Sequence, residues 1–206
     1  VKSEPAPSRG DMVRGFGILI LTMVCMGIVF NVTQTALPKL FSLRVSSITE
    51  QGTLGVGILI AIVYAISGVM QIVGGHLADR YSLKMIYTVG LVCQIPMLVL
   101  IAQVSGMPLV VIATLAVFIN SGTLPAENML IARYIPSHHR ALAFGIKFVL
   151  AFGTAPLAVL MVSKLVELTG EFVWLYLIMA SLMTLAFAAA MLLPKTSVYQ
   201  TTAEAA

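Results

Sequence analysis

Long apolar stretches without acidic or basic residues make up most of the chain, and short polar segments separate them. A bilayer core about 30 Å thick requires about 20 apolar residues in a helix that crosses it. The charge-free stretch from Met85 to Ala126 is too long for one crossing, and the segment AQVSGMP at 102–108 divides it. The pattern therefore predicts six transmembrane helices, at about residues 15–37, 54–77, 85–101, 108–132, 141–163 and 172–193. Pro38 is expected to mark the end of the first.

The composition indicates that lipid is the solvent. Hydrophobic residues make up 59% of the 206 residues and charged residues only 10%, whereas soluble domains carry about 25% charged residues. The expected fold class is therefore all-α, because helices satisfy their own backbone groups in a bilayer. The polar residues 1–13 are interpreted as a cytoplasmic linker, so that the chain is expected to be part of a longer protein, and 195–206 as a cytoplasmic tail.

The distribution of basic residues predicts the orientation, because Lys and Arg collect on the cytoplasmic side of membrane proteins. Three of them, Lys39, Arg44 and Lys164, fall on one side of the six predicted helices. Nine fall on the other side, which is therefore predicted to be cytoplasmic and to hold both termini, in an inner or plasma membrane. These nine are Lys2, Arg9, Arg14, Arg80, Lys84, Arg133, Arg140, Lys147 and Lys195.

An internal repeat is visible when the sequence is shifted by 88 residues. Gly57 then aligns with Gly145, and Asp79 aligns with Glu167. The first and fourth predicted helices also share a polar pattern, NVTQTALP at 31–38 and NSGTLP at 120–125. These matches favour two units of three helices, with chance similarity of apolar segments as the alternative. Because three is odd, such units must insert with opposite orientation, as in many secondary transporters.

The segment GGHLADRYSLK at 74–84 holds the densest charge cluster, in a tight loop between the second and third predicted helices. Gly74 and Gly75 are expected to allow close helix packing, and Asp79 to accept hydrogen bonds from exposed helix amides. Arg80 and Lys84 are expected to hold this loop in the cytoplasm. A purely topogenic role for the loop is the alternative.

The loop resembles the cytoplasmic signature of the major facilitator superfamily, G-x-x-x-D-R-x-G-R-R/K. Its matching residues are Gly75, Asp79, Arg80 and Lys84, whereas Ser82 and Leu83 depart from the pattern. The segment PAENMLIARYIPSHHRALAFGIKF at 125–148 is similar to the junction of the fourth and fifth helices of a family half, with Arg133, Pro136 and Arg140 in the expected places.

This resemblance implies half of a twelve-helix transporter, and the polar lead-in implies the carboxy-terminal half. The expected partners are the lipid bilayer, a small-molecule substrate, and either an amino-terminal six-helix half of the same polypeptide or a second copy of this chain. By resemblance, Asp79 and Arg80 would form a cytoplasmic latch that breaks as the halves rock.

Polar residues inside the predicted helices are candidates for a substrate or proton pathway, because each is costly in a bilayer. Glu127 and Lys147 lie at matching depth in adjacent helices and are predicted to pair, with a purely structural ion pair as the alternative. The remaining candidates are Asn31, Gln34 and Thr35 in the first helix and Asn120 and Thr123 in the fourth, with interhelical hydrogen bonding as the alternative. Gly145, Gly153 and Pro156 are interpreted as helix-packing residues.

The sequence predicts a secondary transporter that moves a small solute by alternating access, in either direction and with proton coupling as one option. No motif for nucleotide binding, zinc hydrolysis or serine hydrolysis occurs in it, so we expect no enzyme, no cofactor and no nucleic acid partner. Cys25 and Cys93 lack neighbouring metal ligands and are interpreted as small hydrophobic residues. A structural subunit of a membrane complex and, less favoured, an intramembrane enzyme with Glu127 and Lys147 are the alternatives.

Overall fold

A computed structural model describes residues 9–45 and 52–194. Within these residues the chain is entirely helical, as predicted, and six spans are long and apolar enough to cross a membrane. The helices are α1 (Arg9–Arg44), α2 (Thr53–Arg80), α3 (Leu83–Gln103), α4 (Met107–Tyr134), the short 3-10 helix η1 (Ser137–His139), α5 (Arg140–Gly153), α6 (Ala155–Thr169) and α7 (Val173–Met191). Together α5 and α6 form the fifth span. Residues 1–8 of the predicted linker and the predicted tail lie outside the described residues.

The helix that contains the first span is longer than its apolar stretch. It begins at Arg9, inside the predicted linker, and it continues through Pro38 to Arg44. The prediction that Pro38 ends the helix is therefore wrong. Proline inside a helix costs about 3 kcal/mol, but Leu37 and Leu40 on either side of it are fully buried. Their packing holds the helix together across the proline.

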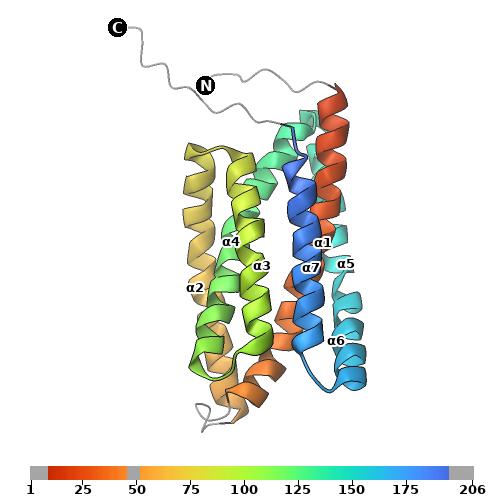
Figure 1. Cartoon of the computed structure of the whole chain (residues 1–206). Coiled ribbons are helices and arrows are strands. Elements are labelled where there is room, and N and C mark those ends of the chain that lie inside the picture. The colour runs from red at the N-terminus through yellow and green to blue at the C-terminus, as the bar shows by residue number, and fades with distance from the viewer. Residues whose placement is uncertain (1–8, 46–51, 195–206) are drawn as a thin grey trace, which may run out of the picture.

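The six spans run up and down in an elongated bundle (Figure 1). The start of α1 and the end of α7 lie at the same end of this bundle, together with the α2–α3 connection. The helix contacts of the first three spans have counterparts among the last three. Helix α2 packs on α4, and correspondingly α5 and α6 pack on α1. Helix α3 contacts α4, and correspondingly α7 contacts α1. Exchanging the first three spans for the last three therefore preserves the set of neighbours. Because α1 and α4 run in opposite directions, the two units are inverted, as predicted.

Two close approaches position α4 in this bundle. A Cβ atom on Gly74 of α2 would collide with the carbonyl oxygen of Gly122 in α4, and one on Gly90 of α3 would collide with Thr123. The predicted packing role of Gly74 is thus present, whereas the neighbouring Gly75 faces open space. Backbones that approach through small residues gain van der Waals contact that lipid cannot supply.

The fifth span is broken, in contrast to the single helix predicted from the sequence. Helix α5 ends at Gly153 and α6 begins at Ala155, with Pro156 in its first turn. A proline lacks the backbone N–H that would continue the ladder, so it is tolerated at a helix start. No described atom lies within 4 Å of a Cβ placed on Gly145 or Gly153. The interpretation of these two glycines as helix-packing residues is therefore wrong for the described part of the chain, and Pro156 marks a break.

Two basic side chains close helix ends at opposite ends of the bundle. The Lys84 Nζ donates to the Met191 and Leu193 carbonyl oxygens at 2.8 and 2.5 Å, at the end of α7. The Arg44 Nη1 donates to the Ala102 carbonyl oxygen at 3.0 Å, at the end of α3. Helix carboxyl ends carry unpaired carbonyl groups and partial negative charge, which both cations satisfy. Arg44 is one of the three basic residues on the side predicted to be non-cytoplasmic, and this contact gives it a structural role.

The contact between Gly74 and Gly122 leads to a prediction about stability. Gly74→Ala places a methyl group against the backbone of α4, and overpacking of this kind costs about 1–3 kcal/mol. Gly75→Ala adds the same group in open space and raises helix propensity by up to about 1 kcal/mol. Thermal unfolding of the purified protein in detergent should show a lower midpoint for Gly74→Ala than for Gly75→Ala. Equal midpoints would contradict the close approach of α2 and α4.

Candidate functional site

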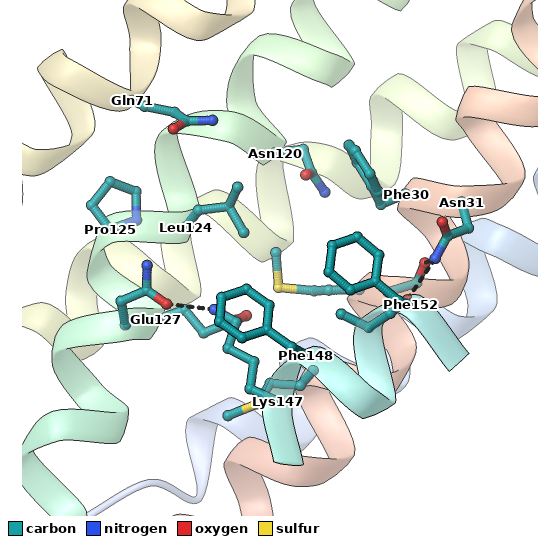
Figure 2. A pocket seen from close by; sticks show the side chains of 15 residues that line it. Phe30, Asn31, Gln71, Asn120, Leu124, Pro125, Glu127, Lys147, Phe148 and Phe152 are labelled. Atoms are coloured by element: carbon teal, nitrogen blue, oxygen red, sulfur yellow. Dashed lines mark hydrogen bonds and ion pairs between the residues drawn. The ribbon is translucent and has the colours of Figure 1, made fainter. Parts of the chain in front are cut away.

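A pocket of about 260 Å³ lies between α1, α2, α4 and α5 (Figure 2). Most of its wall is apolar and comes from methionine and aromatic side chains, of which Phe148 and Phe152 stack with ring centres 6.1 Å apart. Its polar lining residues are Asn31, Gln71, Asn120, Glu127, Asn128 and Lys147. The pocket therefore combines an apolar volume with a small set of polar groups, which is typical of small-molecule sites.

A buried ion pair forms one side of this pocket. The Lys147 Nζ on α5 lies 2.5 Å from Glu127 Oε1 on α4, and the two side chains are only 9% and 2% exposed. The same ammonium donates to Asn128 Oδ1 at 2.6 Å. Helices α4 and α5 are joined by η1, and this short connection brings the two residues to the same depth. The sequence predicted their pairing from that depth, and the structure places them in contact.

A second hydrogen-bonding chain lies behind Glu127. The Tyr87 hydroxyl on α3 lies 3.3 Å from Glu127 Oε2 and 2.8 Å from Thr22 Oγ1 on α1. Thr22 in turn donates to the Leu19 carbonyl oxygen at 3.0 Å. Tyr87 and Thr22 are fully buried. The sequence predicted neither residue, because Tyr87 is one of several tyrosines inside the apolar spans.

Asn31 lines the pocket and also ties α1 to the break in the fifth span. Its Nδ2 donates to the Ala151 carbonyl oxygen at 2.8 Å and to Thr154 Oγ1 at 2.9 Å. The break exposes polar groups that a continuous helix would satisfy internally, and Asn31 binds them. Figure 2 shows this amide beside Phe152 at the edge of the pocket. The interhelical role that the sequence left as an alternative is therefore present.

Asn120 is the other predicted amide in the pocket. It is only 4% exposed, and its Nδ2 has no hydrogen-bond partner among the residues that the structure describes. Such groups are costly when buried. A donor that lines a pocket and has no protein partner is available to a ligand.

Three further predicted residues do not reach the pocket. Gln34 and Thr35 lie on the exposed side of α1, and the Thr35 hydroxyl donates to the Asn31 carbonyl oxygen of its own helix at 2.8 Å. Thr123 packs against Gly90 and donates to the Ile119 carbonyl oxygen at 2.8 Å. Conversely, Asn128 and Gln71 line the pocket and were not predicted.

The loop with the signature pattern lies away from the pocket, at the end of the bundle. Asp79 and Arg80 are exposed in the last turn of α2. The helix-capping contact expected of Asp79 is made by Ser82, whose Oγ accepts from the Met85 backbone N–H at 3.1 Å. Ser82, which departs from the signature pattern, therefore has a clear function as the cap of α3.

The predicted cytoplasmic junction lies at this same end. Arg133 lies in the last turn of α4, and Arg140 begins α5 on the other side of η1. Neither residue lines the pocket. Within the described residues, no three His, Cys, Asp or Glu side chains gather as they would around a metal ion.

Comparison with protein families identifies the fold to which this site belongs. Residues 15–205 match the model of the Major Facilitator Superfamily. The chain belongs to the Major Facilitator Superfamily. The superfamily consists of secondary transporters and not of enzymes, as the sequence analysis expected. No curated protein matches the chain.

Solved structures share the fold of this chain. A peptide transporter POT in complex with sulfate superimposes with a TM-score of 0.74 at 18% sequence identity, over 86% of this chain and 37% of that one. A mutant of POT in complex with alafosfalin superimposes with a TM-score of 0.73 at the same identity, over 86% and 38%. At this identity the match shows the fold alone. The chain spans about 37% of the length of the POT structure.

The bonds of Asn31 lead to a prediction about the broken span. Asn31→Leu removes the hydrogen bonds from Asn31 Nδ2 to the Ala151 carbonyl oxygen and to Thr154 Oγ1, which keep only the bond between them at 2.8 Å. Each lost hydrogen bond costs about 0.5–1.5 kcal/mol. Thr35→Val, four residues later on the same helix, removes a bond within α1 only and should cost less than about 0.5 kcal/mol. Thermal unfolding in detergent compares the two variants. A loss as large for Thr35→Val would show that the interhelical bonds of Asn31 contribute nothing.

Proposed function

We propose that the chain is one six-helix half of a secondary transporter that moves a small solute across a membrane by alternating access. The observation that carries this proposal is the pocket with its buried ion pair between α1, α2, α4 and α5. An ionisable pair inside a bilayer costs free energy, and such pairs therefore indicate a function. Membership of the Major Facilitator Superfamily supplies the class of activity.

The missing half is proposed to cover the face formed by α2 and the fifth span. Only 17% of the most apolar stretch of α2 and 11% of that of α5 and α6 are buried, against 39–50% in the other spans. These same helices carry pocket residues, among them Gln71 and Phe148. A second six-helix unit on this face would close the pocket from the other side.

We assign this chain to the carboxy-terminal half because of its polar lead-in, with the partner half in the same polypeptide and a second copy of the chain as the alternative. The exposed positions of Asp79 and Arg80 at the end of α2 are compatible with a latch to that partner. Among the candidate pathway residues, Glu127, Lys147, Asn31 and Asn120 are favoured because they line the pocket. Gln34, Thr35 and Thr123 are less favoured, since they lie outside it.

The proposed location is an inner or plasma membrane, with both termini in the cytoplasm. The excess of basic residues at the end of the bundle that holds the α2–α3 loop supports this orientation. A structural subunit without transport activity is the remaining alternative. Such a subunit has no need of a pocket or of a buried ion pair at its wall.

Blocking the pocket tests the proposed transport. Leu124→Trp adds bulk inside the pocket, whereas Leu115→Trp adds it on α4 at a side chain that is 43% exposed and outside the pocket. Vesicles that contain the full transporter are loaded with labelled carboxylates, amines, sugars and peptides, and exchange is measured for each. Leu124→Trp should slow exchange of the transported solute roughly tenfold or more, because the pocket encloses most of a ligand's surface. No exchange by the unchanged protein, or equal exchange by both variants, would contradict the proposal.

Cysteine labelling tests the orientation. Tyr81 and Leu168 are 55% and 79% exposed and lie at opposite ends of the bundle. Each is changed to Cys in a protein whose Cys25 and Cys93 have been replaced by Ala. A membrane-impermeant maleimide should label Tyr81→Cys only from the cytoplasmic side and Leu168→Cys only from the outside. The opposite pattern would reverse the proposed orientation.

A further inference from the structure

A small cavity beside the pocket brings together three buried polar side chains. Thr33 of α1, Gln94 of α3 and Asn120 of α4 line it, and they are 7%, 4% and 4% exposed. The Thr33 Oγ1, the Gln94 Oε1 and the Asn120 Nδ2 have no hydrogen-bond partner within residues 9–45 and 52–194. Polar atoms that are buried without a partner are rare in native proteins, and each calls for an explanation. Three of them around one cavity indicate a bound polar ligand.

The hydroxyl of Thr33 differs from other hydroxyls inside the spans. The side chains of Thr35, Ser67 and Thr114 each donate to the carbonyl oxygen four residues earlier in their own helix, at 2.8, 2.7 and 2.7 Å. Such bonds are the usual way in which a hydroxyl is satisfied inside a helix. Thr33 makes no bond of this kind to any residue that the structure describes. Its hydroxyl is therefore available to a partner in the cavity.

Together the three atoms specify a neutral group that both donates and accepts. The Asn120 Nδ2 is a donor, the Gln94 Oε1 is an acceptor, and the Thr33 hydroxyl can be either. A cation would meet the N–H groups of Asn120, and an anion would meet the Gln94 oxygen. A water molecule can accept from Asn120 and Thr33 and donate to Gln94. It then makes three hydrogen bonds, which is typical of buried water.

The size of the cavity selects water over a larger ligand. The space open to the centre of a water-sized sphere is about 10 Å³, and one bound water requires about 10–15 Å³ by this measure. The larger pocket offers about 260 Å³. A cavity lined only by apolar groups stays dry, whereas a polar one of this size holds water. Volume and lining therefore both fit one water molecule.

We infer that this cavity binds one structural water molecule, which Thr33, Gln94 and Asn120 hold between α1, α3 and α4. This inference goes beyond the proposed transport function and does not depend on it. Gln94 and Asn120 lie near the middle of their helices, at a depth where hydrocarbon supplies no hydrogen-bond partner. Helices α1 and α3 belong to the first three-helix unit and α4 belongs to the second. The water therefore bonds the two inverted units to each other.

Asn120 connects this water to the larger pocket. Asn120 and Phe30 line both the cavity and the pocket, and Figure 2 shows both side chains at the pocket wall. A water that accepts from the Asn120 Nδ2 fixes the orientation of this amide. The water thus positions one polar side chain of the pocket wall, although it lies outside the pocket itself.

A high-resolution structure of the full transporter tests this inference directly. The density should show one ordered oxygen within about 2.7–3.2 Å of the Thr33 Oγ1, the Gln94 Oε1 and the Asn120 Nδ2. Two results would overturn the inference. One is a direct hydrogen bond between Asn120 and Gln94, and the other is a cavity without density in a map that resolves other buried waters.

The stability of Thr33→Val tests the same water by the sign of its effect. Valine and threonine have similar shapes and similar helix propensities. If water is bound, the exchange removes one of its three hydrogen bonds, and the midpoint of thermal unfolding in detergent should fall by about 2–4 °C. In a dry cavity the exchange would remove an unsatisfied hydroxyl and raise the midpoint. An unchanged or higher midpoint would therefore count against the water.

Thr35→Val is the matched control for this measurement. It is the same exchange two residues later on α1, and it removes only a bond to the Asn31 carbonyl oxygen of that helix. The midpoint should fall less for Thr35→Val than for Thr33→Val.

A double-mutant cycle tests whether Thr33 and Gln94 share one partner. Thr33→Val together with Gln94→Leu should lower the midpoint by less than the sum of the two single changes, because the first change already weakens the binding of the water. Thr35→Val together with Gln94→Leu should give additive shifts. Gln94→Met replaces Gln94→Leu if the latter does not fold. Additive shifts for Thr33→Val and Gln94→Leu would contradict a shared water.

Discussion

The absence of hydrogen-bonding solvent in a bilayer is the constraint on which this structure depends. Polar groups inside the bundle are favoured where they find a partner in the protein, because an unsatisfied group in hydrocarbon costs several kcal/mol. Helices meet this requirement along their length, and side chains meet it where helices end or break. Arg44 satisfies the end of α3, Lys84 that of α7, and Asn31 the break in the fifth span. The ion pair of Glu127 and Lys147 follows the same rule for charge.

The sequence predicted the six spans because length and apolar composition are properties of each segment alone. It failed where tertiary contacts decide. Pro38 has the local properties of a helix end, but the burial of its neighbours carries α1 onward to Arg44. The break at Thr154 was missed because Gly153 and Pro156 suggested close packing. The break is satisfied by the Thr154 hydroxyl, which donates to the Ala151 carbonyl oxygen, and by Asn31, which lies 120 residues from Ala151 in the chain.

The sequence predicted only part of the site, again because tertiary contacts decide which polar side chains face the pocket. Glu127 and Lys147 stand out because charge within an apolar stretch is rare, and their depth can be calculated from the rise of a helix. Asn31 and Gln34 have similar chemistry and lie three residues apart, yet only Asn31 faces the pocket. The directions of the two side chains differ by only a fraction of a helical turn, and hydropathy does not resolve this difference. Tyr87 and Thr22 have the composition of ordinary core residues, so their role emerges only from their distances to Glu127.

The inverted repeat explains why equivalent ends are closed by different chemistry. At the end of the first span Arg44 binds the end of the third, and at the end of the fourth span the Tyr134 hydroxyl donates to the Pro194 carbonyl oxygen beyond the sixth, at 3.2 Å. The same topological position thus holds a cation in one unit and a phenol in the other. Any residue that carries a hydrogen-bond donor and reaches the carbonyl groups can fill this position. Sequence similarity between the units therefore fades while their helix contacts stay alike, since geometry fixes the need and several side chains satisfy it.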